Sequence, residues 1–323
     1  MMNTIPIIFN ERQFKRTILG GNVCSPNIKI PLTVILLNRG GTHFRSQQLE
    51  TLLSEGFARI ICVENSAQSY VIEEYAQNYP AVKFIIPQEK ITSGEMINAA
   101  IGESLTEFAL VLWDDIKITK NMVTKNSYDK IIKDNIFCTA PYLQSNSFMY
   151  LPVRMVPSVE KYSLIISPET ILSSFSDTAY PFDFIGIYNC NKFKQLGGFD
   201  YTLTNPYWQN LDFSLRGWLW GEKIQISPML KFMYEEEIPL EDSTVDYMQL
   251  RFYLKNTAPV FTNDHAYIPI SRVFNYIRSA SKNLFSSIKD FIDARKWVEK
   301  NRYRFKMDMP YLVDNWERCR SQK

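Results

Sequence analysis

Between residues 31 and 113, short apolar runs alternate with amphipathic segments. The runs predict four β-strands, namely PLTVILL (31–37), RIICV (59–63), VKFII (82–86) and FALVLW (108–113). Apolar side chains recur at helical spacing in the segments 44–57, 70–79 and 93–105, the last with Ser93 as its expected N-cap. Nearly continuous apolar strands that alternate with helices are typical of a mostly parallel sheet covered on both faces. The predicted fold class is therefore α/β.

Polar side chains follow three of these four strands. They are Asn38 and Arg39, then Glu64, Asn65 and Ser66, then Asp114 and Asp115. Ligands of open parallel sheets bind outside the carboxyl ends of the strands, so we expect a binding site at this edge. Two adjacent carboxylates suit a hard divalent cation that also holds an anionic ligand, although such a pair can equally begin a loop and cap a turn.

The regular alternation ends after Thr119. A helix is expected around 121–134, and MYLPVRMV and YSLIIS give weak strand signals. NLDFSLRGWLWG has the spacing of a buried helix that stops at Gly221, and further helices are expected from 245 onward and over 271–305.

Three stretches, ITSGEMINAAIGES, FALVLWDDIKIT and LGGFDYTLTNPYWQNLDFSLRGWLWG, occur in this order along the chain. In their order and spacing the chain resembles the GT-A glycosyltransferases of the family 2 type, over residues 31–256. The resemblance implies a Rossmann-like, mostly parallel sheet flanked by helices. The GT-A domain would span 32–260, with a nucleotide-binding half (32–120) and an acceptor half (121–260). A leader (1–31) would pack on it, and a C-terminal helical extension (261–323) would follow.

The resemblance also implies roles for individual residues. Asp115 would be the principal ligand of Mg²⁺ or Mn²⁺, with Asp114 beside it. The donor would be a UDP-, GDP- or dTDP-sugar, and the residues that would bind it are Asn38, Arg39, Glu64, Asn65, Ser93, Gly94, Asn98, Trp113 and Asp114. Trp208, Gln209 and Asn210 would lie on the acceptor side.

The general base is where the sequence departs from the family. Relatives carry Glu-Asp-x-Asp before a Leu-x-x-Arg helix, whereas this chain has Gln209-Asn210-Leu211-Asp212 before Arg216. Amides do not accept a proton at neutral pH, so Asp212 or another carboxylate, Asp183 or Asp200, would serve as base. A slow enzyme, an unusual acceptor or lost activity are the remaining alternatives. Asp212 could also simply form a salt bridge with Arg216 at helical i,i+4 spacing.

Composition narrows the class of protein. The formal net charge of +2 gives no reason to expect nucleic acid as a partner, and 46% hydrophobic with 22% charged residues is ordinary for a globular chain. The five cysteines are scattered without a metal-ligand spacing, which indicates reduced thiols. We expect a cytoplasmic protein, because no secretory signal begins the sequence and no apolar run approaches the roughly 18–20 residues of a membrane span.

The C-terminal part is locally basic. Ten Lys and Arg residues between 271 and 306 face only three acidic ones, and apolar residues recur there at helical spacing. These helices could lie on the inner face of an anionic membrane and serve a lipid-linked acceptor. Alternatively, they pack on the domain or on a second subunit, which would make a homo-oligomer.

The leading hypothesis is a glycosyltransferase that moves a sugar from a nucleotide donor to a glycan or other hydroxyl acceptor, in one inverting, metal-dependent displacement. A degenerate GT-A protein that only binds a sugar or a partner is a second hypothesis. A nucleotidyltransferase is a third, but it would be expected to have a Gly-rich basic loop after the first strand, and NRGGTHFR is a poor version of one.

Overall fold

A computed structural model describes residues 12–23, 27–40, 45–65, 69–160, 163–170, 175–279 and 284–316. All four predicted strands form, as β2 (Ile30–Leu37), β3 (Phe57–Val63), β4 (Val82–Pro87) and β5 (Phe108–Trp113). The helices between them are α1 (Arg45–Glu55), α2 (Ser69–Asn78) and α3 (Ser93–Glu103). The predicted alternation of strands and helices is confirmed to within a few residues.

One large sheet crosses the molecule in the order β1-β4-β3-β2-β5-β10-β6-β11-β9. Its other strands are β1 (Arg16–Gly20), β6 (Cys138–Gln144), β9 (Ser176–Asp177), β10 (Gly186–Asn189) and β11 (Ile224–Met233). Strands β4, β3, β2 and β5 pair in parallel, as do β6 and β11, whereas β10 runs antiparallel to β5 and β6. This confirms the α/β class. Because β2 lies between β3 and β5, the polar residues that follow these three strands meet at one edge.

The segment before β2 contributes to the sheet. β1 pairs antiparallel with β4 from Arg16 to Gly20 and forms the outer strand beside it. This part of the predicted leader is therefore built into the domain as an edge strand.

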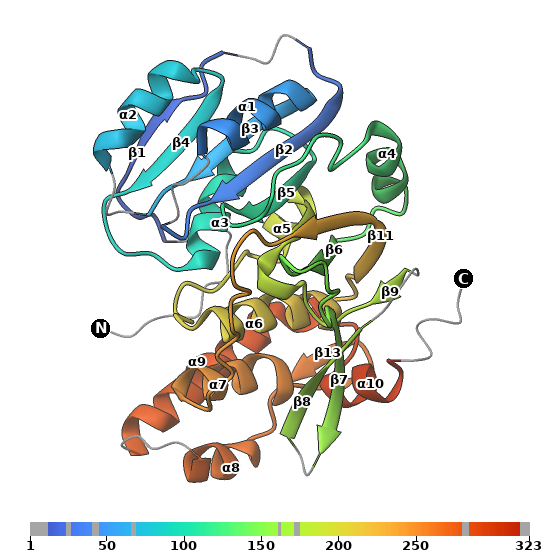
Figure 1. Ribbon diagram of the computed structural model, residues 1–323. Helices are drawn as coiled ribbons and strands as arrows, with labels where there is room; N and C mark the ends of the chain where they lie inside the picture. The colour runs from blue at the N-terminus through green and yellow to red at the C-terminus, as the bar shows by residue number, and fades with distance from the viewer. Residues whose placement is uncertain are drawn as a thin grey trace.

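The second half of the chain packs below the parallel strands (Figure 1). It contains α4 (Lys125–Lys133), the hairpin of β7 (Arg154–Glu160) and β8 (Ser163–Glu169), the 3₁₀ turn η1 (Phe182–Phe184), α5 (Cys190–Gln195) and α6 (Pro206–Leu219). After β11 follow α7 (Tyr247–Phe252), the π-helical turn η2 (Tyr253–Thr257), a small hairpin of β12 (Val260–Thr262) and β13 (His265–Tyr267), α8 (Arg272–Ser279), α9 (Leu284–Asn301), η3 (Arg302–Arg304) and α10 (Met309–Asp314). Within the described ranges, no helix is both long and apolar enough to cross a bilayer.

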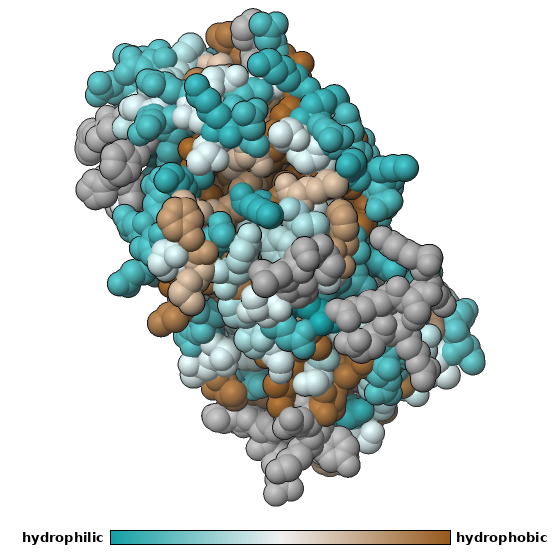
Figure 2. Space-filling model, turned by 45° about the vertical axis from the view of Figure 1, so that its right-hand side comes forward, coloured by the Kyte–Doolittle hydropathy of each residue, from teal (hydrophilic) through white to brown (hydrophobic). Residues whose placement is uncertain are grey.

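The surface mixes hydrophilic and hydrophobic residues. On the face shown in Figure 2, hydrophobic residues gather in a hollow beneath the upper part of the molecule and again near its lower end. Hydrophilic residues cover most of the rim around that hollow.

The N-terminus of α3 corrects one prediction. Thr92, not Ser93, is the N-cap, and its hydroxyl accepts a hydrogen bond from the backbone of Glu95 at 3.2 Å. The Glu95 carboxylate accepts one in return from the Thr92 backbone at 2.9 Å. A capping box needs Glu or Gln three residues after the cap, and only Thr92 has one at that distance.

Helix α3 lies unusually close to the segment around Phe199 and to α6. A Cβ atom added to Gly94 would lie 2.4 Å from the Phe199 Cβ and 2.6 Å from the Gln209 Cδ. Gly217, within α6, has more room, since its nearest neighbour would be the Phe137 ring at 3.4 Å. The close approach of α3 to α6 therefore depends on the missing side chain at Gly94.

We predict opposite results for the same substitution at these two glycines. Gly94→Ala should lower the free energy of unfolding by about 1–3 kcal/mol, because overpacking moves Phe199 and Gln209. Gly217→Ala is the matched control and should leave stability unchanged or raise it by up to about 1 kcal/mol, through helix propensity. Urea unfolding measures both. Equal behaviour of the two variants would contradict the close packing.

Candidate functional site

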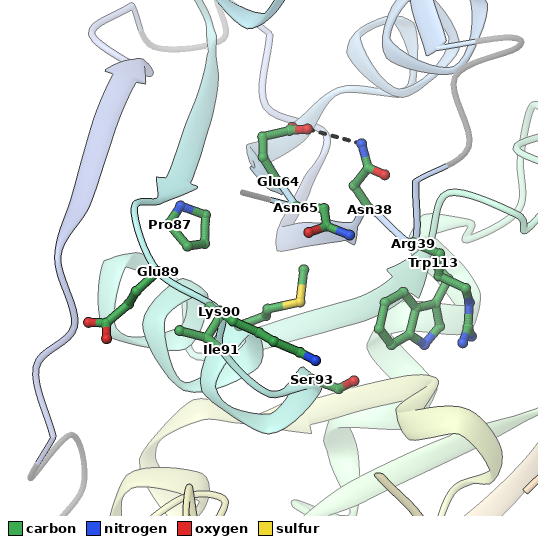
Figure 3. Close-up of a pocket in the computed structure, with 11 residues that line it drawn as sticks. Asn38, Arg39, Glu64, Asn65, Pro87, Glu89, Lys90, Ile91, Ser93 and Trp113 are labelled. Atoms are coloured by element: carbon green, nitrogen blue, oxygen red, sulfur yellow. Dashed lines mark hydrogen bonds between the residues drawn. The ribbon is translucent and has the colours of Figure 1, made fainter. Parts of the chain in front are cut away.

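A cavity of about 360 Å³ opens at the predicted edge of the sheet (Figure 3). It is lined by Asn38, Arg39, Glu64, Asn65, Pro87, Glu89, Lys90, Ile91, Ser93, Met96 and Trp113. These residues follow β2 and β3, end and follow β4, begin α3 and end β5, so four neighbouring strands and one helix deliver them together. A volume of this size suits a small molecule, and polar groups stand beside apolar ones as in most ligand sites.

The inner wall of the cavity is a buried ion pair. Glu64 is 1% exposed, and its carboxylate pairs with the guanidinium of Arg45 from α1. The Asn38 side chain donates a further hydrogen bond to Glu64 at 3.0 Å. A carboxylate can be buried this deeply only when it is paired and hydrogen-bonded, so Arg45 and Asn38 fix its orientation toward the cavity.

Trp113 and two cations form the opposite part of the lining. The guanidinium carbon of Arg39 lies 3.9 Å from the centre of the Trp113 ring. The Trp113 indole N–H donates to the backbone carbonyl of Asp183 at 2.8 Å, which holds the ring in place. Lys90 points into the cavity from the loop between β4 and α3 (Figure 3). Arg39 and Lys90 thus bring positive charge to a lining that also contains Glu64 and Glu89.

Asp114 and Asp115 lie directly after β5, next to this lining. The Asp114 carboxylate accepts a hydrogen bond from the Arg39 backbone at 3.0 Å, and Asp115 pairs with the Arg39 guanidinium at 3.0 Å. Burial raises the pKa of Asp114 to about 6, against the hydrogen bond from Arg39, and the neighbouring charge of Asp115 adds to the rise. Burial likewise raises the pKa of Asp115. Burial thus disfavours the charged form of both carboxylates.

The open oxygens of this pair fit a divalent cation. Asp114 Oδ2 and Asp115 Oδ1 are buried and have no hydrogen-bond partner. Among the described residues, no three His, Cys, Asp or Glu side chains are grouped to hold a metal by themselves. Mg²⁺ and Mn²⁺ commonly bind through one or two carboxylates together with phosphate oxygens of a ligand, and this donor set matches that case.

Asp183 reaches the same place from a distant part of the sequence. It sits in η1 with φ of 54° and is 9% exposed. Its carboxylate accepts a hydrogen bond from the Tyr234 hydroxyl at 2.8 Å and pairs with the Arg39 guanidinium. Burial raises the pKa of Asp183 to about 7, although Arg39 and Tyr234 act against the rise. Asp183, Asp115 and Arg39 are therefore one cluster.

Three predicted donor residues, Gly94, Asn98 and Asp114, are not part of the cavity lining, although Asp114 directly follows Trp113, which is. Gly94 packs against Phe199, and the Asn98 side chain exchanges two hydrogen bonds of 2.9 Å with the backbone of Phe199. In the structure Gly94 and Asn98 tie α3 to the segment before α6. Ser93, at the start of the same helix, does line the cavity.

The three residues predicted for the acceptor side are buried. Gln209 is 0% exposed, accepts from the Gly94 backbone and donates to the Thr92 hydroxyl and the Asp200 carbonyl. Asn210 is 1% exposed and donates to the Pro181 carbonyl at 2.7 Å. Trp208 donates to the Thr244 carbonyl at 3.0 Å. Their polar groups thus form hydrogen bonds within the protein.

Asp212 and Asp200 belong to a closed ionic cluster. Both are 0% exposed, and the amine of Lys255 lies 2.7 Å from Asp212 and 2.9 Å from Asp200. Arg216 pairs with Asp212 at 3.1 Å, as the i,i+4 alternative predicted, and Asn256 donates to its other oxygen at 2.8 Å. Burial alone would raise the pKa of Asp200, but Lys255 and Arg251 outweigh it and hold that pKa below its usual value. This geometry favours the structural interpretation of Asp212.

Several residues of the site were not predicted. Arg45, Tyr234, Lys90 and Met96 contact or line it through elements that only the fold brings near. The carboxyl-edge rule could have predicted Lys90 and Met96, since the segment that runs from β4 into α3 also starts at the carboxyl end of a strand. Tyr234 had no such signal, because it follows β11, a strand beyond the predicted alternation.

The buried cluster gives a stability prediction. Lys255→Met should lower the free energy of unfolding by about 3–5 kcal/mol, because Asp200 and Asp212 would remain buried without their shared cation. Lys192→Met is the matched control, since its 2.7 Å pair with Glu222 is about a quarter exposed, and it should cost only about 0–1 kcal/mol. Urea unfolding of both variants checks this. Similar losses would show that burial does not strengthen the cluster.

Comparisons with known proteins agree with the fold just described. No family model and no curated protein matches the sequence, so the family 2 resemblance stays a prediction. The solved structure of GalNAc-T7 with UDP, GalNAc and Mn²⁺ is similar over 88% of this chain, with 12% identity and a TM-score of 0.58. This chain covers 57% of the length of that one.

A mannosyltransferase from Pyrobaculum calidifontis in complex with GDP-Man and Mn²⁺ is 8% identical over 91% of this chain and 79% of its own. Its TM-score of 0.44 is too low to support an argument. The likeness to GalNAc-T7 shows the fold alone, and the protein has the GT-A fold.

Proposed function

We propose that the protein is a glycosyltransferase that moves a sugar from a nucleotide-sugar donor to a hydroxyl acceptor. The observation that carries the proposal is the cavity at the carboxyl edge of β2, β3 and β5, together with Asp114 and Asp115, which contact the cavity residue Arg39 and each have one oxygen without a hydrogen-bond partner. GalNAc-T7, which shares the fold, was solved with UDP and Mn²⁺. Nucleotide-binding α/β sheets place their ligands at this edge.

The donor nucleoside would bind in the lined cavity. Glu64 and Asn65 offer hydrogen-bond acceptors for a base or ribose, and Asn38 keeps Glu64 in position. Met96 and Ile91 supply apolar contact from the α3 side. The diphosphate would then extend toward Asp114, where Lys90 and Arg39 add positive charge.

A divalent cation would be held by Asp114 and Asp115 through their open oxygens. When bound, such a cation acts as a Lewis acid and stabilises the charge that develops on a diphosphate leaving group. The chain's own contribution is to bury these carboxylates and fix them through the Asp114 backbone carbonyl, which accepts from Gln48 at 2.8 Å. Arg39 also anchors Asp114 through its backbone N–H.

Asp183 is the carboxylate that we propose as general base. Asp183 borders the donor site through Trp113 and Tyr234, whereas both oxygens of Asp212 are already used inside the protein. A base at Asp183 would take the proton from the acceptor hydroxyl as that oxygen attacks the anomeric carbon in a single inverting displacement. The acceptor would be a glycan or another hydroxyl compound.

A second candidate function is a sugar-binding subunit without catalysis. The observation that favours it is the use of Gln209 and Asn210, at the family's usual acidic positions, as buried hydrogen-bond donors. Donor turnover separates the two functions, because a binding subunit would retain nucleotide affinity and release no free nucleotide.

Nucleotide binding tests the donor site. We expect UDP, GDP or dTDP to bind more tightly with Mn²⁺ than without it, as measured by calorimetry on the full chain. Asp115→Asn should reduce this gain at least about tenfold, since even partners of metal ligands contribute that much. Asp129→Asn is the matched control, an exposed carboxylate on α4 paired with Lys125, and should change nothing. Absence of binding by every nucleotide would refute the donor site.

The base assignment has its own test. Asp183→Asn should lower kcat by about a hundredfold or more, because an amide cannot take the proton from the acceptor hydroxyl. Asparagine tolerates the positive φ at this position, so the backbone should be retained. Released nucleotide diphosphate, followed over time with a responsive donor, measures kcat. An unchanged kcat would remove Asp183 from the mechanism.

A further inference from the structure

Arg39 occupies the centre of the acidic cluster. Its guanidinium pairs with Asp115 through Nε at 3.0 Å and with Asp183 through Nη2. The flat group also lies against the Trp113 ring, 3.9 Å from its centre. The two carboxylates come from the turn after β5 and from η1, far apart in the sequence, and this one side chain joins them.

In each carboxylate of the Asp114–Asp115 pair, only one of the two oxygens has a hydrogen-bond or ion-pair partner. Asp115 Oδ2 faces Arg39, while Asp115 Oδ1 has no partner. Asp114 Oδ1 accepts from the Arg39 backbone, while Asp114 Oδ2 has no partner. The open oxygens can accept a cation, but the positive charge of Arg39 already stands beside the place where it would bind.

We propose that Arg39 is an internal counter-ion that competes with the divalent cation for Asp115, and that it leaves this carboxylate when cation and nucleotide diphosphate bind. The inference rests on the proposed donor site. Without a ligand, Arg39 pairs with both Asp115 and Asp183. With the ligand bound, the cation neutralises Asp115, and the guanidinium is free to pair with a phosphate.

The surroundings of Arg39 allow this exchange. Its side chain is 30% exposed and lines the cavity, unlike Lys255, which is 0% exposed and enclosed. A guanidinium matches two phosphate oxygens as well as it matches a carboxylate. Stacking on Trp113 can persist while the polar edge of the group turns toward a new partner.

The exchange has a thermodynamic consequence. A cation that binds alone must separate Arg39 from Asp115 without giving the guanidinium another anion. A diphosphate supplies that anion, so cation and nucleotide should each raise the affinity for the other, and the two effects must be equal. Removal of the guanidinium should strengthen cation binding to the nucleotide-free protein and weaken the coupling.

The experiment measures Mn²⁺ binding to the nucleotide-free full chain by the electron paramagnetic resonance signal of free Mn²⁺. Arg39→Ala and Arg39→Gln should bind Mn²⁺ about tenfold more tightly than the wild type, which corresponds to one partly exposed ion pair. Glutamine keeps a planar, uncharged group on a shortened stem and so guards against a packing effect. Lys289→Ala, which removes the same charge from an exposed position on α9, should bind Mn²⁺ as the wild type does.

Two outcomes would overturn the inference. They are an unchanged Mn²⁺ affinity, or a loss of Mn²⁺ binding, in both Arg39 variants that keep the wild-type thermal transition. The same variants titrated with UDP, GDP and dTDP separate this inference from the donor site. Tighter Mn²⁺ binding without binding of any nucleotide would support the role of Arg39 as a counter-ion to the cation and refute the proposed donor.

Discussion

Buried carboxylates constrain how this chain can fold, because each requires a cation that another segment must deliver. Arg45 of α1 reaches Glu64 after β3, and Arg39 after β2 reaches Asp115 and Asp183. Lys255 of η2 serves Asp200 and Asp212 in the lower half. A shift of any of these segments would leave one of the buried carboxylates without its cation. Charge compensation therefore acts together with apolar packing in placing these segments.

These ion clusters differ in whether solvent and ligands can reach them. Lys255 and its two carboxylates are sealed from solvent, so their geometry is fixed and serves stability. The Arg39 cluster borders the cavity, and two of its neighbouring carboxylate oxygens remain open. Only a cluster of the second kind can exchange one counter-ion for another. This contrast favours a structural role for Asp212 and supports the cation-binding role that we propose for Asp115.

The sequence was informative where the signal is local. Apolar runs located the four parallel strands β2 to β5, and the carboxyl-edge rule placed Asn38 and Glu64 on the cavity. Contacts between distant segments could not be predicted. No periodicity connects Lys255 to Asp212, or Tyr234 to Asp183, because each pair meets only after the second half has folded against the sheet.

The amides at Gln209 and Asn210 have a physical explanation that does not require lost activity. Gln209 donates to the Thr92 hydroxyl and to the Asp200 carbonyl, and a glutamate there would have no proton to donate to either. Asn210 donates to the Pro181 carbonyl, for which aspartate would be equally unsuitable. Pro181 stands two residues before Asp183, so Asn210 helps to fix the turn that carries Asp183 to the site. Asn210, which stands where the similar family carries an acid, is thus linked by its hydrogen bond to Pro181 with the turn that holds Asp183, the base that we propose.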